Sequence, residues 1–236
     1  MPVLEALRNP AVTVDKVLLA DNANGAAVEV LLAAARERGV AVRRVPAFRV
    51  THLSGNGRQD QGVVADIQAP RLGTLAGWLA RLGDRGDQRL LLLDGVATPA
   101  NLGMVLRTAT AAGMDGVVVP RRGSPDIGPL VIKASAGIAL DAVILRERDP
   151  ASAATQLGAA GFRLYGLRAG RDASLWDAPF SDRAVFVIGG ESTGISDAVA
   201  AQIDQWISIP LAGAVESLNV ASAAAVLCFE VSRRRG

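Results

Sequence analysis

The sequence is short of several residue types, and each shortage excludes a class of protein. Cys228 is the only cysteine in the 236 residues, which excludes intramolecular disulfides and cysteine-rich metal sites. No apolar run reaches the roughly 18 residues of a membrane span. The opening MPVLEALRNP also lacks the apolar centre of a signal peptide. We therefore expect a soluble, cytoplasmic protein that binds neither a metal ion nor a membrane.

Lysine and histidine are also scarce. The 25 basic residues include only two lysines, Lys16 and Lys133, and His52 is the only histidine. Arginine can form two parallel hydrogen bonds to a phosphate, so an arginine-rich chain permits a nucleic-acid partner. A genomic coding bias would produce the same excess of arginine, so composition alone leaves both explanations open. Two runs, Arg121-Arg122 and Arg233–Arg235, are candidates for phosphate contacts or for solvated ends.

Helix and strand patterns alternate along the chain in two blocks. Residues 1–70 predict a small α/β unit. Residues 71–87 carry a helical pattern followed by a polar break at 83–87, which together predict a linker. Residues 88–236 repeat the alternation more strongly, and their first run, RLLLLD, suits a strand buried on both faces of a parallel sheet. The expected helices are 3–8, 25–39, 101–113, 150–161 and 217–235, and the expected strands are 16–20, 40–45, 61–67, 89–94, 116–120, 162–167, 184–190 and 205–210.

Three loops of the second block follow predicted strands, where ligands of parallel sheets bind. The first loop leaves a strand at Asp94 and enters a helix at Asn101. The second leaves a strand at Gly189, and the third leaves one at Pro210 and enters a helix near Ser217. Taken singly, Asn101 and Ser217 suit helix N-caps, and an ordinary turn explains the glycine.

The second loop is similar to a nucleoside triphosphate site. In the run VFVIGGESTGIS, four residues separate Gly189 from Gly194, and Ser196 stands where a phosphate-binding loop has its magnesium-ligating hydroxyl. Residue Ile195 stands where such a loop needs a lysine that reaches the outer phosphates. A nucleoside triphosphatase is therefore excluded, and Glu191 inside the loop needs another explanation.

Together the three loops resemble the motifs of a known enzyme family. Their patterns are N-L-G-x-x-x-R-T-A from Asn101, V-I-G-G-E-x-x-G-I-S from Val187 and I-P-L-x-G-x-x-E-S-L-N-V from Ile209. In order and spacing they are similar to the SpoU (TrmH-like) ribose 2′-O-methyltransferases of the SPOUT class. Residues 1–70 resemble the L30e-like substrate-binding domain of members that act on 23S ribosomal RNA. The resemblance spans nearly the whole chain.

The resemblance implies a homodimer that methylates a ribose 2′-hydroxyl of RNA with S-adenosylmethionine. Its catalytic domain, 88–236, would be a mostly parallel α/β sheet tied in a deep trefoil knot, an exception to the rule that chains do not thread their own loops. The cofactor would lie bent in the knot, with its adenine held by backbone groups of Gly189, Ile209 and Leu218. Glycine would let the backbone approach the ligand closely. The second subunit would help to complete the active site.

The residues that match the family's motifs are the candidates for catalysis. A ribose hydroxyl reacts only when its proton is removed or its developing charge is stabilised. His52 lies far in sequence from every motif, so no histidine base is expected in the catalytic unit. Arginine is effectively always protonated, so we expect Arg107 to stabilise the alkoxide and bind a phosphate, and Glu191 to orient Arg107 or accept a proton. Neutral hydrogen bonds that fix the loops are expected from Asn101, Ser217 and Asn219.

Both blocks are expected to contact RNA. Arg121 and Arg122, which follow a strand of the second block, are the candidates for phosphate contacts. The first block would add contacts through shape and backbone charge. It has Arg58-Gln-Asp-Gln-Gly62 where relatives usually carry Asn-His-Gln-Gly, which puts the substrate's identity in question. Transfer RNA is therefore an alternative to 23S ribosomal RNA, and an RNA-binding or ribosome-assembly factor without catalysis is an alternative of another class.

Overall fold

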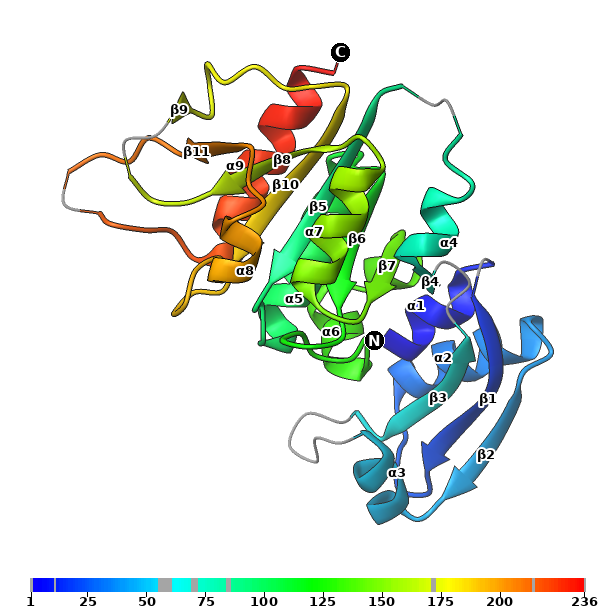
Figure 1. Ribbon diagram of the computed structural model, residues 1–236. Coiled ribbons are helices and arrows are strands. Elements are labelled where there is room, and N and C mark those ends of the chain that lie inside the picture. Colours follow the sequence, from blue (N-terminus) through cyan, green and yellow to red (C-terminus); the bar gives the residue numbers. More distant parts are fainter. Residues whose placement is uncertain are drawn as a thin grey trace. The chain divides into compact units, whose positions relative to one another are not determined.

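The computed structural model describes residues 2–10, 12–54, 61–68, 72–83, 86–170, 173–213 and 215–235. The chain divides into two compact units, residues 1–70 and 71–236 (Figure 1). Two features noted in the sequence, the Arg58-Gln-Asp segment and the centre of the polar break at 84–85, lie outside the described residues.

The first unit is a three-stranded sheet with three helices. Its elements are α1 (Pro2–Arg8), β1 (Thr13–Ala20), α2 (Ala26–Glu37), β2 (Ala41–Val45), α3 (Ala47–Ser54) and β3 (Val63–Gln68). The strand order is β2-β1-β3, with β1 parallel to β2 and antiparallel to β3. Helix α2 stops before Gly39, whose φ of 66° is a left-handed conformation that glycine adopts at little cost. The helix end predicted at this glycine is therefore confirmed.

The second unit is built on an eight-stranded sheet in which every pairing is parallel. Its strands are β4 (Leu72–Thr74), β5 (Gln88–Asp94), β6 (Gly116–Pro120), β7 (Ile144–Glu147), β8 (Arg163–Leu167), β9 (Ala173–Ser174), β10 (Arg183–Gly189) and β11 (Gln205–Ser208). The strand order is β4-β7-β6-β5-β10-β8-β11-β9. The predicted mostly parallel sheet is confirmed.

Helices cover both faces of this sheet. They are α4 (Leu75–Leu79), α5 (Pro99–Ala111), α6 (Pro129–Ala134), the short η1 (Ile138–Leu140), α7 (Pro150–Ala159), α8 (Asp197–Ala200) and α9 (Val220–Arg233). Helices α5, α6 and α9 share one apolar core, and α4, α7 and α8 share the other. Figure 1 shows α7 crossing in front of β5 and β6. Among the described residues, no helix is both long and apolar enough to span a membrane.

Strand β5 is buried on both faces, as the run RLLLLD predicts. Leu91 and Leu93 belong to the core under α5 and α9, whereas Leu90 and Leu92 belong to the core under α7. Successive side chains of a strand point to opposite faces, so only an unbroken apolar run can fill both cores. Cys228 lies in the first core, where burial raises the pKa of its thiol to about 12 and favours a packing role.

Close packing fixes α5, the helix that follows the first motif loop. A Cβ on Gly103 would lie 2.5 Å from the Cβ of Ala134 and 2.6 Å from the carbonyl oxygen of Val131. The backbones of α5 and α6 can therefore approach only because this residue has no side chain. The glycine of the N-L-G pattern thus has a packing reason that is independent of any ligand.

The predicted start of the second unit, residue 88, is too late in the chain. Residues 72–79, expected in a linker, form β4 and α4, and β4 pairs with β7 at the edge of the sheet. Thr74 caps α4 by accepting a hydrogen bond from the backbone of Gly77, and Leu75 is fully buried. The helical pattern of LGTLAGWLARL concealed a three-residue edge strand, because so short a strand has no period of its own. The elements α3, α6, β7, α8 and β9 were also missed.

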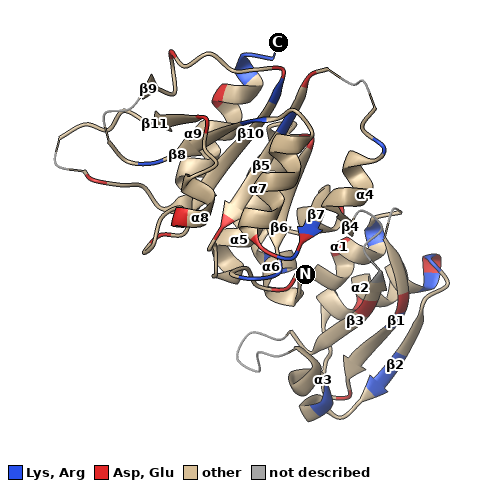
Figure 2. Cartoon of the chain, in the orientation of Figure 1, with Lys and Arg blue, Asp and Glu red and all other residues tan. Residues whose placement is uncertain are grey.

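The C-terminal arginines are bonded to the fold and are not solvated ends. Figure 2 shows the Lys/Arg colour at the end of α9. Arg234 donates to Glu230 at 2.6 Å and to the carbonyl oxygens of Leu175 and Ala178, both at 2.5 Å. Its guanidinium also stacks 4.6 Å from the ring centre of Phe180. One side chain therefore holds the segment between β9 and β10 against α9.

The neighbouring Arg235 ties α9 to the start of the sheet. It donates to the carboxylates of Asp87 at 2.8 Å and Asp115 at 2.7 Å. Two hydrogen bonds from Arg233, and a further one from Arg234, hold the pKa of the Glu230 carboxyl down at about 2 although the group is buried. The terminal arginines thus form a structural network.

Candidate active site

A buried aspartate ties the end of β5 to the loop after β10. Asp94, the last residue of β5, is only 6% exposed. Its Oδ2 accepts hydrogen bonds from the backbone N and the Oγ of Ser196, each 2.7 Å long. The serine that resembled a magnesium ligand therefore anchors the far end of its loop. Asp94 is a site residue that the sequence did not single out, and its only signal is its place at the end of an apolar strand.

The glycines of the second loop allow the chain to pack against itself. A Cβ on Gly189 would lie 2.1 Å from the carbonyl carbon of Gly194, and one on Gly190 would lie 2.4 Å from the carbonyl oxygen of Gly95. Gly190 and Gly194 also exchange two backbone hydrogen bonds, and Gly194 has a φ of 65°. We expected these glycines to make room for a ligand. The structure adds a packing reason: a Cβ on Gly189 or Gly190 would overlap neighbouring backbone.

Asn219 brings the three loops together. Its Nδ2 donates to Oδ1 of Asn101 at 3.3 Å and to a carboxylate oxygen of Glu191. Its Oδ1 accepts from the backbone N of Ala221 at 2.9 Å and of Ser222 at 3.4 Å. A single side chain therefore caps α9 and contacts one residue from each of the other two motifs.

Both predicted helix caps are displaced from their expected positions. Helix α9 starts at Val220 with Asn219 as its cap, and Ser217 is an exposed loop residue before it. Helix α5 starts at Pro99, so the buried Asn101 lies in its first turn and Thr98 occupies the cap position. A proline favours the first helical position because its missing N–H costs no hydrogen bond there. This signal, present in the sequence, outweighs the capping preference of asparagine.

Arg107 lies on the exposed side of α5 without a protein partner. Within the part of the chain that the structure describes, its guanidinium forms no hydrogen bond or ion pair. Glu191 is bonded to Asn219 rather than to Arg107. In the single chain Glu191 therefore does not orient Arg107, contrary to our expectation, and the guanidinium is open to a ligand.

Family comparisons match both units of the chain. Residues 88–229 match the SpoU rRNA Methylase family, and residues 1–73 match the family described as RNA 2'-O ribose methyltransferase substrate binding. The chain belongs to the SpoU methylase family. A 23S rRNA (guanosine-2'-O-)-methyltransferase, RlmB of Xanthomonas axonopodis pv. citri (strain 306), is 34% identical over 236 residues, which cover 99% of this chain and 94% of the relative.

Solved structures agree with this assignment. The SpoU methyltransferase AviRb from Streptomyces viridochromogenes, in complex with AdoMet, has a TM-score of 0.77 at 24% identity and matches 99% of this chain and 87% of its own. An AdoMet-bound rRNA methyltransferase from Sinorhizobium meliloti has a TM-score of 0.74 at 25% identity and matches 99% and 84%. This SpoU methylase is therefore an RNA 2′-O-methyltransferase of the SPOUT fold, and S-adenosylmethionine is the methyl donor of its family. The predicted family, enzyme class and cofactor are confirmed.

The loops after β10 and β11 of this SpoU methylase suit its cationic cofactor. Residues 190–196 and 209–219 contain Glu191 and Glu216 but no lysine or arginine, so a positively charged sulfur is not repelled there. None of the described residues between 210 and 218 forms a hydrogen bond to another described residue. Their backbone N–H and C=O groups are therefore available to an adenine. Leu218 is exposed beside them, and Ile209 packs against the core at the loop's start.

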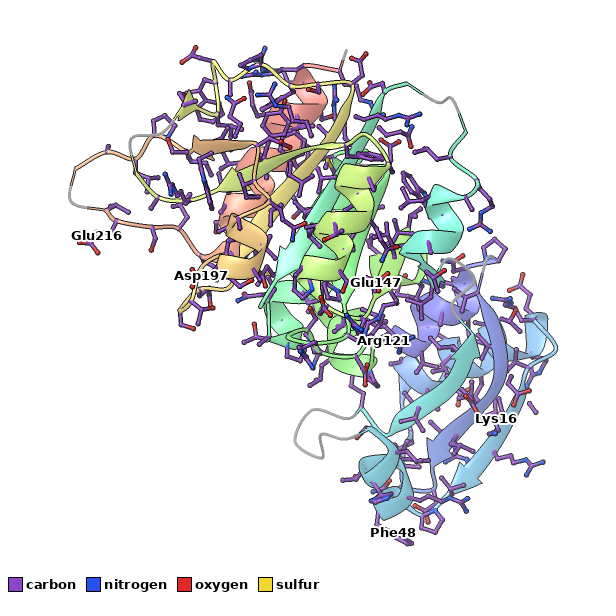
Figure 3. The ribbon with its side chains drawn as sticks, viewed as in Figure 1. Lys16, Phe48, Arg121, Glu147, Asp197 and Glu216 are labelled. Atoms are coloured by element: carbon purple, nitrogen blue, oxygen red, sulfur yellow. The ribbon has the colours of Figure 1, made fainter. Side chains whose placement is uncertain are left out.

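The two predicted RNA-binding arginines lie at the end of β6. The backbone N of Arg121 donates to the carbonyl oxygen of Glu147 at 2.8 Å, and that of Arg122 donates to Arg148 at 3.1 Å. Figure 3 labels Arg121 and Glu147 at this edge of the sheet. Both arginine side chains are exposed, and neither pairs with an acidic group in the described ranges. The backbone fixes the turn, which leaves the two guanidinium groups free to bind phosphate.

Proposed function

We propose that this enzyme methylates the 2′-hydroxyl of a guanosine in 23S ribosomal RNA and acts in the cytoplasm. One observation carries the choice of substrate. The similarity to a relative named as a 23S rRNA (guanosine-2'-O-)-methyltransferase runs through both units and includes the substrate-binding unit.

The reaction needs the hydroxyl, the methyl group and the sulfur in line. S-adenosylmethionine supplies a methyl group on a positively charged sulfur. In our proposal Arg107 binds a phosphate next to the target ribose and stabilises the alkoxide as it forms, because a guanidinium stays protonated and cannot serve as a base. Glu191 is the candidate acceptor of the hydroxyl proton.

The remaining motif residues position these two groups. Asn219 holds Glu191 by a direct hydrogen bond and is itself bonded to Asn101. Ser217 is exposed in the same loop and is available to the RNA or the cofactor. The backbone groups of Gly189, Ile209 and Leu218 are proposed to hold the adenine, because they border or lie in the two stretches of loop that contain no lysine or arginine.

We further propose a homodimer and a trefoil knot formed by the loops after β10 and β11. Helices α5 and α9 contact each other on one face of the sheet, where Met104 is 40% exposed and Phe229 is 54% exposed. A second copy would remove this apolar surface from water. Arg107 lies one helical turn from Met104, so the partner subunit would be close to it.

The first unit is proposed to bind RNA through α3. Residues 38–54 contain no acidic residue, and Phe48 on α3 is 75% exposed. Arg38 and Arg44 of this segment donate to backbone carbonyls of the unit, so Arg43 and Arg49 are its arginines available to RNA. Phe48 lines a hollow together with Arg49, Thr51 and His52. An exposed aromatic ring among arginines suits a stacked, unpaired base held by its phosphates.

Methyl transfer from labelled S-adenosylmethionine to purified RNA tests the proposed substrate. We expect 23S ribosomal RNA to be labelled at one ribose and transfer RNA to remain unlabelled. Labelling of transfer RNA and not of 23S ribosomal RNA would mean that transfer RNA is the substrate. Calorimetry with the cofactor tests the non-catalytic alternative, because a factor without catalysis has no need to bind S-adenosylmethionine.

Two substitutions of Asn219 separate its capping role from its role in the site. Asp at this position can still accept the backbone hydrogen bonds of α9 but cannot donate to Glu191. Asn219→Asp should therefore keep the cap of α9, but it places a second carboxylate against Glu191 and should lower the rate of methyl transfer at least tenfold. Asn219→Ala should also lose about 1 kcal/mol of stability with the cap. Equal rates for Asn219→Asp and the parent would remove Asn219 from the proposed site.

A further inference from the structure

The end of β7 contains a buried positive charge that the protein leaves largely uncompensated. Arg146 is only 6% exposed, and its Nη1 has no hydrogen-bond partner among the described residues. The hydroxyl of Ser124, in the turn after β6, is likewise buried and unpaired within the described chain. Buried charges and hydroxyls are normally hydrogen-bonded, because leaving them unpaired costs free energy. Two such groups in adjacent segments point to a missing partner.

The surrounding charges identify that partner as an anion. The only acidic group within ion-pair distance of Arg146 in the described chain is Asp126, whose Oδ1 lies 3.6 Å from Nη2 and whose side chain is fully exposed. Burial, and then the positive charge of Arg121, lower the pKa of Arg146. A second arginine near a buried one adds repulsion that an anion between them would remove.

The location of these groups connects them to the active site. Gly123 lies in the same turn with a φ of 82°, and a Cβ on it would lie 3.6 Å from the Cα of Gly95. Gly95 in turn touches Gly190, the residue before Glu191. The turn of Ser124 is therefore one backbone layer away from the loop of Glu191, at the edge of the sheet where Figure 3 labels Arg121.

We propose that Arg146, Ser124 and Arg121 form a binding site for one backbone phosphate of the RNA substrate, with Asp126 as its occupant in the free enzyme. The inference rests on the proposed function, because it assumes that the ligand of this edge is RNA. Arg146 supplies charged hydrogen bonds, Ser124 donates its hydroxyl, and Arg121 closes the site from the solvent side. Binding of the phosphate displaces the exposed carboxylate of Asp126. The site fixes the strand next to the target ribose and takes no part in proton transfer.

Substitutions of Arg146 test the site. Arg146→Gln should weaken RNA binding by about tenfold or more and should lower the slope of log affinity against log salt by about 0.7 to 0.9, the value for one phosphate contact. The affinity for S-adenosylmethionine, measured by calorimetry, should not change. Arg81→Gln, at an exposed arginine whose guanidinium forms no bond within the described ranges, is the control for loss of one positive charge and should leave both quantities as they are.

Two further variants keep the test valid if Arg146→Gln does not fold. Ser124→Ala should weaken RNA binding a few-fold, and Asp126→Asn should strengthen it, because the competing carboxylate is removed. Inorganic phosphate should raise the melting temperature of the parent more than that of Arg146→Gln. If phosphate raises the melting temperature but the variants bind RNA as tightly as the parent, the site binds small anions only, and the proposal is overturned.

The outcomes separate this inference from the proposed function. If the parent enzyme methylates 23S ribosomal RNA while the variants of Arg146, Ser124 and Asp126 bind RNA with the parental affinity and salt slope, the phosphate site is wrong and the function stands. If the parent neither binds nor methylates 23S ribosomal RNA, the proposed function fails, and the site fails with it.

Discussion

Two groups of arginines in the second unit have the same chemistry and opposite surroundings. At the end of α9, Arg234 and Arg235 donate hydrogen bonds to carboxylates and backbone carbonyls of the protein. On α5 and at the end of β6, the guanidinium groups of Arg107, Arg121 and Arg122 have no partner in the described part of the chain. A guanidinium that is already bonded stabilises the protein, whereas one without partners can bind phosphate. The difference lies in the neighbours, since the residue type is the same.

The sharpest test of this comparison is Arg107→Ala. Loss of a charge that acts on the developing alkoxide should slow methyl transfer by about a hundredfold or more. The melting temperature should stay the same, because the exposed side chain contacts no partner. Single-turnover assays and thermal melting measure the two effects, with Arg81→Ala as the control. A variant that melts early but transfers methyl groups at the parental rate would place Arg107 in the structural group.

Arg234→Ala should show the opposite profile. It removes a charged pair with Glu230 and two backbone hydrogen bonds, so the free energy of unfolding should fall by about 2 kcal/mol. The matched variant Arg233→Ala loses two hydrogen bonds to the same carboxylate, but from a side chain that is 69% exposed and screened by water, so it should cost clearly less than Arg234→Ala. Urea denaturation measures both values. Equal losses would mean that the extra bonds of Arg234 contribute nothing.

Acid should break the ion pairs that Glu230 forms with Arg233 and Arg234. The folded-state pKa of Glu230 is about 2, below its ordinary 4.5, so its ion pairs stabilise the protein fully above about pH 4.5 and are lost as the pH falls toward 2. The stability difference between the parent and Glu230→Gln should therefore be on the order of 2 kcal/mol at pH 7 and should disappear near pH 2. Melting curves across this range provide the measurement. A difference that does not depend on pH would show that packing, and not charge, is what Glu230 provides.

Arg121→Gln and Arg122→Gln should have the smallest effects. Each should lower the salt slope of RNA binding by about 0.7 to 0.9 and weaken binding only a few-fold, without changing stability. Arg235→Gln is the contrasting variant, because it should lower stability and leave the salt slope unchanged. If Arg235→Gln changes the salt slope as much as Arg121→Gln does, the two groups are not distinct in function.

Most of the fold could be predicted because periodicity follows from burial. RLLLLD must be a two-sided strand, and the helix that ends at Gly39 needs a left-handed residue there. The failures occurred in short elements and at helix starts. Pro99 begins α5 before Asn101, and Asn219 rather than Ser217 caps α9. At these points one hydrogen bond decides between neighbouring residues, and a periodic pattern carries no information about it.

The sequence by itself determined the family, the reaction and the identity of the motif residues, because these depend on residue types at fixed spacing along strand ends. Only the tertiary structure decided which side chains have partners. In the folded chain Glu191 accepts a hydrogen bond from Asn219, and Asp94 accepts one from Ser196. Arg146 is buried with its charge largely uncompensated. Partners come from segments far apart in the chain, at distances set by packing. Only the folded chain therefore shows which arginines are bonded to the protein and which have no partner among the described residues.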